Sequence, residues 1–84
     1  MQKVVSIVIP AYNQAHWLPE AIQSALNQTI PCEVIVVNDG SPDNTSEVAK
    51  MFDVKLIEKE NGGLSSSRNA GIKEATGEWI LTLD

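Results

Sequence analysis

Residues 4–13 read VVSIVIPAYN, an apolar run that turns abruptly polar at its end. The same change occurs in VIVVNDGS (34–41), VKLIEKENGG (54–63) and WILTLD (79–84). Segments with helical patterns separate the four runs, which is typical of parallel strands joined by helices. We therefore expect an α/β fold, a Rossmann-like parallel sheet in the order β-α-β-α-β-α-β with helices on both faces. Because parallel strands end at one edge of the sheet, the polar clusters predict a ligand site there.

Local signals set the expected bounds of each element. Pro19 fits the first turn of a helix that starts near Trp17, because its missing N–H is not needed there. Gly77 is expected to end the last helix. We predict strands over 4–11, 33–38, 54–59 and 79–83, the third of them nearer an edge, and helices over about 17–28, 44–52 and 64–75.

The composition is that of one small globular domain. The chain has 84 residues, 43% of them hydrophobic, and a net charge of −5. An acidic chain without a Lys/Arg cluster argues against a nucleic-acid partner, and the single Cys32 cannot form an internal disulfide. No apolar stretch approaches the roughly 20 residues that cross a membrane, and no signal peptide is evident. These features predict a cytoplasmic protein.

Three common classes of nucleotide-binding protein lack their motifs here. The first strand ends in PAYNQ (10–14) without a glycine, whereas dinucleotide-binding domains need G-x-G-x-x-G at this point. The P-loop pattern G-x-x-x-x-G-K-[ST] is also absent. Nucleotidyltransferases of similar architecture carry a glycine-rich loop in the same place. All three classes are therefore excluded.

Asp39 is the first candidate site residue, at the tip of a strand that we expect to be central. Gly40 permits a sharp turn, which leaves the Asp39 carboxylate facing the crevice. There it can accept a hydrogen bond from the imide N–H of a pyrimidine base or from a ribose hydroxyl. The alternative is that Asp39 only closes its own Asx-turn.

The segment ENGGLS (60–65) has the pattern of an anion-binding cradle, two glycines that lead into a helix N-terminus. Arg68 follows about one turn into that helix, and it is nearly the only cation expected at the polar edge. Most of the lysines fall on strand beginnings or helix faces, which normally means solvated surface. The alternative is that Gly62 and Gly63 only form a turn.

A divalent cation is the second component that the charges suggest. An anionic diphosphate beside Asp39, Asp43 and Asp84 would be repelled, at a cost on the order of kilocalories per close pair. Bound Mg²⁺ or Mn²⁺ removes this repulsion, since carboxylate and phosphate oxygens can coordinate it together. Asp84 is the candidate metal ligand, although an acidic strand end is more often a cap or turn residue.

Four blocks of the chain resemble glycosyltransferase family 2, whose members have the GT-A fold. They are VSIVIPAYN (5–13), EVIVVNDGS (33–41), the pair NGGL (61–64) and SRNAGI (67–72), and WILTLD (79–84), which matches the strand that leads into the family's Asp-x-Asp motif. The blocks occur in order at the family's spacing and cover the whole chain. The resemblance identifies residues 1–84 as the N-terminal nucleotide-sugar-binding part of a glycosyltransferase domain, truncated at the start of Asp-x-Asp.

The resemblance implies a set of site residues and a reaction. Asp39 would hold the uracil-type base of a UDP-linked sugar donor, Arg68 would contact the base or the diphosphate, and Asp84 would contact the ribose or the metal. The transfer would be inverting and metal-dependent, with a carboxylate base beyond residue 84, so that no catalytic residue lies in this chain. The nucleotide-binding residues implied are Pro10, Ala11, Tyr12, Asn13, Asp39, Gly62, Arg68 and Asp84.

The acceptor is not specified by the sequence, and saccharides, lipids and proteins all remain open. The isolated chain is expected to be inactive, and the full-length protein to be cytoplasmic or to lie at the cytoplasmic face of a membrane. Two other functions remain open. One is a non-catalytic nucleotide-binding module. The other is a folding fragment that forms homodimers through an open sheet edge.

Overall fold

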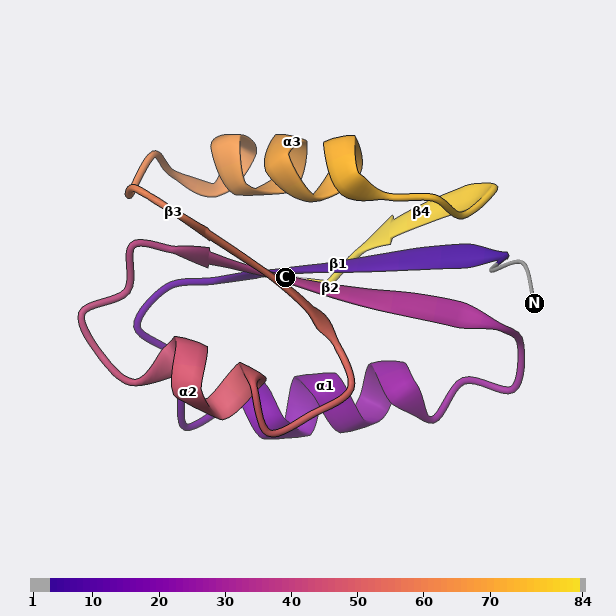
Figure 1. Cartoon of the computed structure of the whole chain (residues 1–84), viewed down its shortest axis with the longest axis horizontal. Helices are drawn as coiled ribbons and strands as arrows, with labels where there is room; N and C mark the ends of the chain where they lie inside the picture. Colours follow the sequence, from indigo (N-terminus) through magenta and orange to yellow (C-terminus); the bar gives the residue numbers. More distant parts are fainter. Residues whose placement is uncertain (1–3, 84) are drawn as a thin grey trace.

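The computed structural model describes residues 4–83 as a three-layer α/β fold. Four parallel strands form one sheet in the order β3-β2-β1-β4. In Figure 1 the helices α1 and α2 lie on one face of this sheet and α3 lies on the other. The predicted fold class is confirmed. The elements are β1 (Val5–Ala11), α1 (Leu18–Leu26), β2 (Cys32–Asp39), α2 (Thr45–Ala49), β3 (Lys55–Lys59), α3 (Leu64–Glu74) and β4 (Trp79–Thr82).

The two central strands, β1 and β2, form the middle of the core. Their residues are apolar on both faces, as is usual for parallel strands covered by helices. The α1 helix packs against them through an apolar stripe with helical spacing, Leu18, Ala21, Ile22 and Ala25, all of them buried. The strand β3 lies at an edge of the sheet, as its mixed pattern predicted. The carboxyl ends of β1 and β2 are therefore held in a rigid setting.

The second helix is shorter than predicted, and the third helix ends before Gly77. The second helix has only five residues, and the Asp43 side chain accepts from the Thr45 N–H at its start. The prediction that Gly77 ends the third helix was wrong, because α3 stops at Glu74. Gly77 is needed for packing, since a Cβ there would lie 2.7 Å from the backbone nitrogen of Ser6. The close approach brings the chain alongside β1 just before β4 begins.

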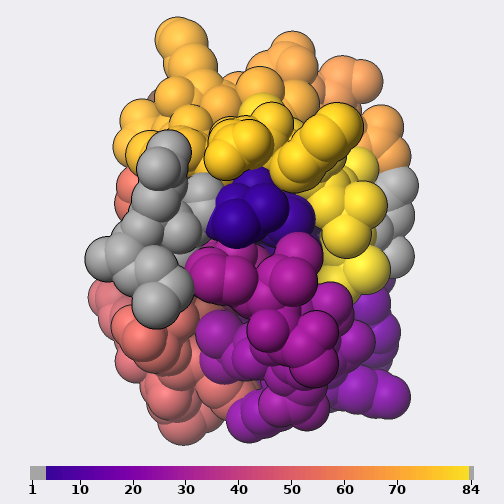
Figure 2. Space-filling model, turned by 90° about the vertical axis from the view of Figure 1, so that its right-hand side faces the viewer, coloured from indigo at the N-terminus to yellow at the C-terminus, as the bar shows by residue number. Residues whose placement is uncertain are grey.

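Glu33 stabilises this close approach through hydrogen bonds at the amino ends of the strands. Its carboxylate Oε2 accepts from Ser6 Oγ at 2.6 Å, from the Thr76 N–H at 2.6 Å and from Thr76 Oγ1 at 2.8 Å. Figure 2 views this end of the molecule, where yellow atoms of the C-terminal residues lie directly against the indigo atoms of β1. Partial burial raises the pKa of Glu33, but these hydrogen bonds outweigh it and hold the pKa below its ordinary value of 4.5.

Glu33→Gln is expected to destabilise the fold by about 1 kcal/mol at neutral pH, because the three donors lose a charged acceptor that is only partly shielded from water. The pKa of Glu33 is lower in the folded chain, so its contribution is complete above pH 4.5 and is lost as the pH falls through the folded pKa. Urea unfolding at pH 7 and pH 3 measures this. Glu47→Gln, an exposed control, should change neither value, and an equal loss in both variants would contradict the assignment.

None of the helices within residues 4–83 combines the length and the apolar character that a membrane span requires.

Candidate functional site

A pocket of about 310 Å³ opens at the carboxyl ends of the strands, the edge that the polar clusters predicted. The ends of β1 and β2 form its floor, and the start of α3 with the loop before it forms one wall. Its lining residues are Pro10, Ala11, Tyr12, Gln14, Asp39, Asn61, Gly63, Leu64 and Ser67. Segments that are far apart in the sequence thus meet around one cavity.

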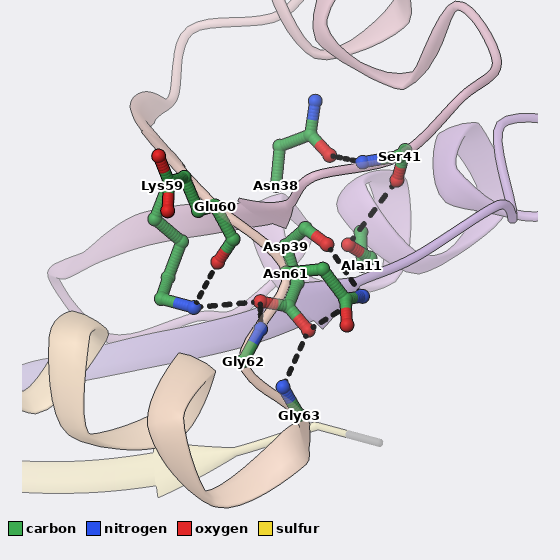
Figure 3. Close-up of polar contacts among 9 residues, drawn as sticks. All are labelled: Ala11, Asn38, Asp39, Ser41, Lys59, Glu60, Asn61, Gly62 and Gly63. Atoms are coloured by element: carbon green, nitrogen blue, oxygen red, sulfur yellow. Dashed lines mark hydrogen bonds and ion pairs between the residues drawn. The ribbon is translucent and has the colours of Figure 1, made fainter.

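Asp39 is the charged residue at the centre of this site, and its side chain is held on several sides (Figure 3). Oδ1 accepts from Lys59 Nζ at 2.7 Å and from the Gly62 N–H at 2.9 Å, and Oδ2 accepts from the Gly63 N–H at 3.0 Å. The hydrogen bond from Lys59 is the main reason that the pKa of Asp39 lies below its usual range, despite the opposing effect of burial. The carboxylate is therefore ionised and fixed in direction.

The glycines of the predicted anion cradle do bind an anion, but that anion is Asp39. The Gly62 and Gly63 N–H groups that the sequence assigned to an external ligand donate to this carboxylate. Gly40 makes the contact possible. Its φ is +68°, and a Cβ at this position would lie 2.7 Å from the Asn61 backbone nitrogen. The loop before α3 can therefore close onto the end of β2.

The turn after β2 is closed by the side chain of Asn38, and the Asx-turn considered for Asp39 does not form. Asn38 Oδ1 accepts from the Ser41 N–H at 3.0 Å, while its Nδ2 donates to Ser46 Oγ at 2.6 Å. The Asp39 side chain points the other way, to the loop that begins at Lys59 (Figure 3). Asp39 is thus not needed to close the turn after β2.

Lys59 is the main residue that the sequence analysis missed. Most lysines were expected on solvated surface, and Lys59 differs, because its ammonium pairs with Asp39 and its side chain is only 20% exposed. Lys59 is the last residue of β3 and lies opposite Asp39 in the β2–β3 register. The strand order, which the sequence pattern does not reveal, is what brings the two together.

The loop after β1 is tied to the loop after β2. The Asn13 N–H donates to Ser41 Oγ at 2.9 Å, and the Ala15 N–H donates to Asp43 Oδ2 at 3.1 Å. Asn13 has a φ of +53°, the left-handed conformation that asparagine tolerates better than most residues. These contacts hold Tyr12 at the mouth of the pocket, where it is 48% exposed.

The structure brings together half of the predicted nucleotide-binding residues as pocket lining, namely Pro10, Ala11, Tyr12 and Asp39. Asn13 and Gly62 are not lining residues, but their N–H groups donate to Ser41 Oγ and to Asp39 Oδ1 respectively. Arg68 lies half-buried on α3 and is not a lining residue. Asp84 lies outside the described residues. The lining residues that the prediction omitted are Gln14, Asn61, Gly63, Leu64 and Ser67.

Within residues 4–83, no three His, Cys, Asp or Glu side chains come together in a way that could hold a metal ion. The candidate ligand Asp84 is not among these residues. The repulsion between Asp39 and a bound diphosphate, which suggested a cation, is already partly offset, because Lys59 and two backbone N–H groups donate to the Asp39 carboxylate. Asp43 is likewise occupied, since it accepts from the Ala15 and Thr45 N–H groups.

An open parallel sheet with a pocket at the carboxyl ends of its central strands defines the class of Rossmann-like ligand-binding domains. The particular family follows from comparison with known proteins. The sequence model described as glycosyl transferase family 2 matches residues 6–84. The chain belongs to this family.

A sequence relative supports the same assignment. EpsJ of Bacillus subtilis, named as a glycosyltransferase, is 43% identical over 90 residues that include the whole of this chain and 26% of EpsJ. The chain therefore spans about a quarter of the length of this relative.

Two solved structures share the fold and contain nucleotides. S. aureus TarS 1–349 in complex with UDP has a TM-score of 0.87 and 30% identity, over 96% of this chain and 27% of the TarS 1–349 chain. The mannosyltransferase PcManGT from Pyrobaculum calidifontis, in complex with GDP-Man and Mn²⁺, has a TM-score of 0.78 and 26% identity, over 95% of this chain and 26% of PcManGT.

Proposed function

We propose that this chain is the N-terminal nucleotide-sugar-binding part of a glycosyltransferase domain, and that its pocket holds the nucleotide of a UDP-linked donor. The observation that carries the proposal is the Asp39 carboxylate, ionised, only 5% exposed and placed in a pocket of about 310 Å³. A carboxylate accepts from the imide N–H of uracil, and Tyr12 offers an exposed aromatic side chain beside it. The nucleotide complexes of TarS and PcManGT are consistent with such a ligand.

The remaining nucleotide contacts are proposed from the family resemblance. The Pro10, Ala11, Tyr12 and Asn13 segment would lie along the base, Gly62 would support Asp39, and Arg68 would contact the base or the diphosphate. Asp84 would contact the ribose or a bound Mg²⁺ or Mn²⁺, which supplies positive charge for the departing diphosphate. PcManGT, a relative in fold, is solved with Mn²⁺.

The proposed reaction is an inverting transfer of a hexose to a saccharide, lipid or protein acceptor. An acceptor hydroxyl would attack the anomeric carbon while a carboxylate base removes its proton. That base is proposed to lie outside residues 1–84, so the chain by itself should bind the donor without turning it over. The proposed location is cytoplasmic, or the cytoplasmic face of a membrane.

Titration of the ¹⁵N-labelled chain with UDP, with and without Mn²⁺, tests the proposal. Binding should shift the amide signals of Ala11, Asp39 and Gly63, which border the pocket, and leave Asp53 at the opposite end of β3 unchanged. Mn²⁺ broadens nearby signals, so Mg²⁺ serves as the diamagnetic comparison. Shifts scattered over the surface, or none at millimolar UDP, would contradict the proposed function.

A second function, self-association through the sheet edge, is favoured by the exposed apolar residues of β4. This strand pairs with β1 on one side only, and Trp79, Ile80 and Leu81 are 69%, 43% and 56% exposed. An apolar edge strand of this kind can pair with a second copy. A homodimer would appear as a doubled mass in light scattering at high concentration, and a monomer under those conditions would exclude it.

A further inference from the structure

Lys59 is not in contact with the pocket, yet it contacts the residue on which the proposed site depends. Its ammonium donates to Asp39 Oδ1 at 2.7 Å and to the Glu60 carbonyl oxygen at 2.6 Å. Lys59 is not among the residues that line the pocket, whereas Asp39 is. The hydrogen bond to the Asp39 carboxylate is therefore the contact through which Lys59 can position a group that faces the pocket.

The two oxygens of this carboxylate have different surroundings. The partners of Oδ1, Lys59 and Gly62, both lie outside the pocket lining, while the partners of Oδ2, Gly63 and Asn61, both belong to it. Oδ2 is therefore the oxygen on the pocket side. A carboxylate oxygen accepts about two hydrogen bonds.

The hydrogen bonds leave one of these acceptor positions open. Oδ1 already has two close donors, at 2.7 and 2.9 Å. Oδ2 has one close donor, the Gly63 N–H at 3.0 Å, and a long contact of 3.4 Å from Asn61 Nδ2. The Asn61 amide has a better acceptor in the Asp39 carbonyl oxygen, at 3.0 Å. Oδ2 can therefore accept one further hydrogen bond, from a group inside the pocket.

The glycine at position 62 leaves room for this arrangement. A Cβ on Gly62 would lie 3.0 Å from Lys59 Nζ and 2.9 Å from Ser66 Oγ. A larger residue would therefore compete with the ammonium for its place beside Asp39. The lysine, the glycine and the carboxylate form a single packed unit at the end of β2 and β3 (Figure 3).

We propose that Lys59 is a positioning residue for the nucleotide base. It occupies Oδ1 of Asp39 and so keeps Oδ2 turned to the pocket as the single acceptor for the imide N–H of the base. The inference rests on the proposed function, and it adds that the base contact depends on a side chain that the base does not touch. Lys59 has no contact with the diphosphate in this scheme.

The test compares uridine with UDP, because only UDP carries the diphosphate. Lys59→Met removes the ammonium and keeps the aliphatic stem. It should weaken both ligands by the same factor, about tenfold, in NMR titrations at pH 7. Lys59→Arg should restore most of the affinity, because it also donates to a carboxylate. Lys50→Met, an exposed lysine on the other side of the sheet, is the matched control and should bind like the unmodified chain.

A pH profile separates positioning from a general loss of structure. Lys59 lowers the pKa of Asp39, so the Asp39 carboxylate of the Lys59→Met variant should take up a proton at a higher pH. As the pH falls, uridine binding by this variant should therefore be lost earlier than in the unmodified chain. If Lys59→Met unfolds, Lys59→Gln is used for the pH profile, because it removes the positive charge of the lysine beside Asp39.

Three results would overturn the inference. Unchanged affinity and an unchanged pH midpoint in Lys59→Met would show that Asp39 is positioned without the lysine. Loss of UDP affinity alone would show that Lys59 acts on the diphosphate. If the unmodified chain bound neither uridine nor UDP while keeping its fold, the proposed function itself would fail, and the inference with it.

Discussion

Asp39→Asn is expected to weaken UDP binding about 100-fold, the largest effect of any single substitution in the pocket. The amide of asparagine has the size of the carboxylate but no charge, and an NH₂ group, which is a donor, replaces one of the two oxygens. Lys59, Gly62 and Gly63 all donate to this side chain. The amide nitrogen of asparagine is itself a donor, so wherever it faces one of these groups the hydrogen bond between them is lost. When the amide nitrogen takes the place of Oδ2, the acceptor for the base is lost as well.

Isothermal titration with UDP, beside thermal unfolding of each variant, measures this effect. Asp53→Asn removes the same charge from an exposed position at the other end of β3, and it should bind UDP normally. The unfolding data show whether lost affinity reflects lost structure. Equal affinities for the Asp39 and Asp53 variants would remove Asp39 from the site.

Gly71→Ala is expected to destabilise the fold by about 2 kcal/mol, although helix propensity alone predicts the opposite sign. Replacing a glycine inside a helix by alanine ordinarily stabilises the fold by about 0.5–1 kcal/mol. In α3, however, a Cβ on Gly71 would lie 2.3 Å from Val8 Cγ1 and 3.0 Å from Val8 Cγ2. Val8 is completely buried in β1 and has little room to move.

Urea unfolding of Gly71→Ala beside Asn69→Ala separates packing from propensity. Asn69 lies on the exposed side of the same helix, where alanine should be neutral or slightly stabilising. The Gly71 variant should also move α3 outward, and with it Leu64 and Ser67, which line the pocket. A Gly71 variant as stable as the Asn69 variant would mean that Val8 can turn aside and that α3 does not need the glycine.

The sheet and its polar edge were predictable because they depend on short-range patterns. Apolar runs that end in polar clusters mark parallel strands, and the stripe from Leu18 to Ala25 marks a helix that packs on them. The direction of the strands then places Tyr12, Asp39 and Asn61 at one edge, as the structure has them. Sequence-distant residues could be grouped in this way without any knowledge of strand order.

The contacts inside the site were not predictable on this basis. Lys59 has the pattern of a surface lysine on an edge strand, and Gly62 and Gly63 have the pattern of a cradle for an external anion. Both interpretations changed once β3 was placed beside β2, with Lys59 opposite Asp39. The interpretation of Gly77 changed for the same reason, because its neighbour Ser6 is 71 residues away in the chain.

The sequence by itself therefore determined the fold class, the edge that holds the pocket and the family, since each depends on residue types at regular local spacings. Only the tertiary structure decided that Asp39 pairs with Lys59, that the Asp39 carboxylate accepts from the Gly62 and Gly63 N–H groups, and that Oδ2 has one close donor while Oδ1 has two. The physical reason is that hydrogen bonds and charge pairs act over about 3 Å, and such distances between remote residues exist only after the strands have taken their order.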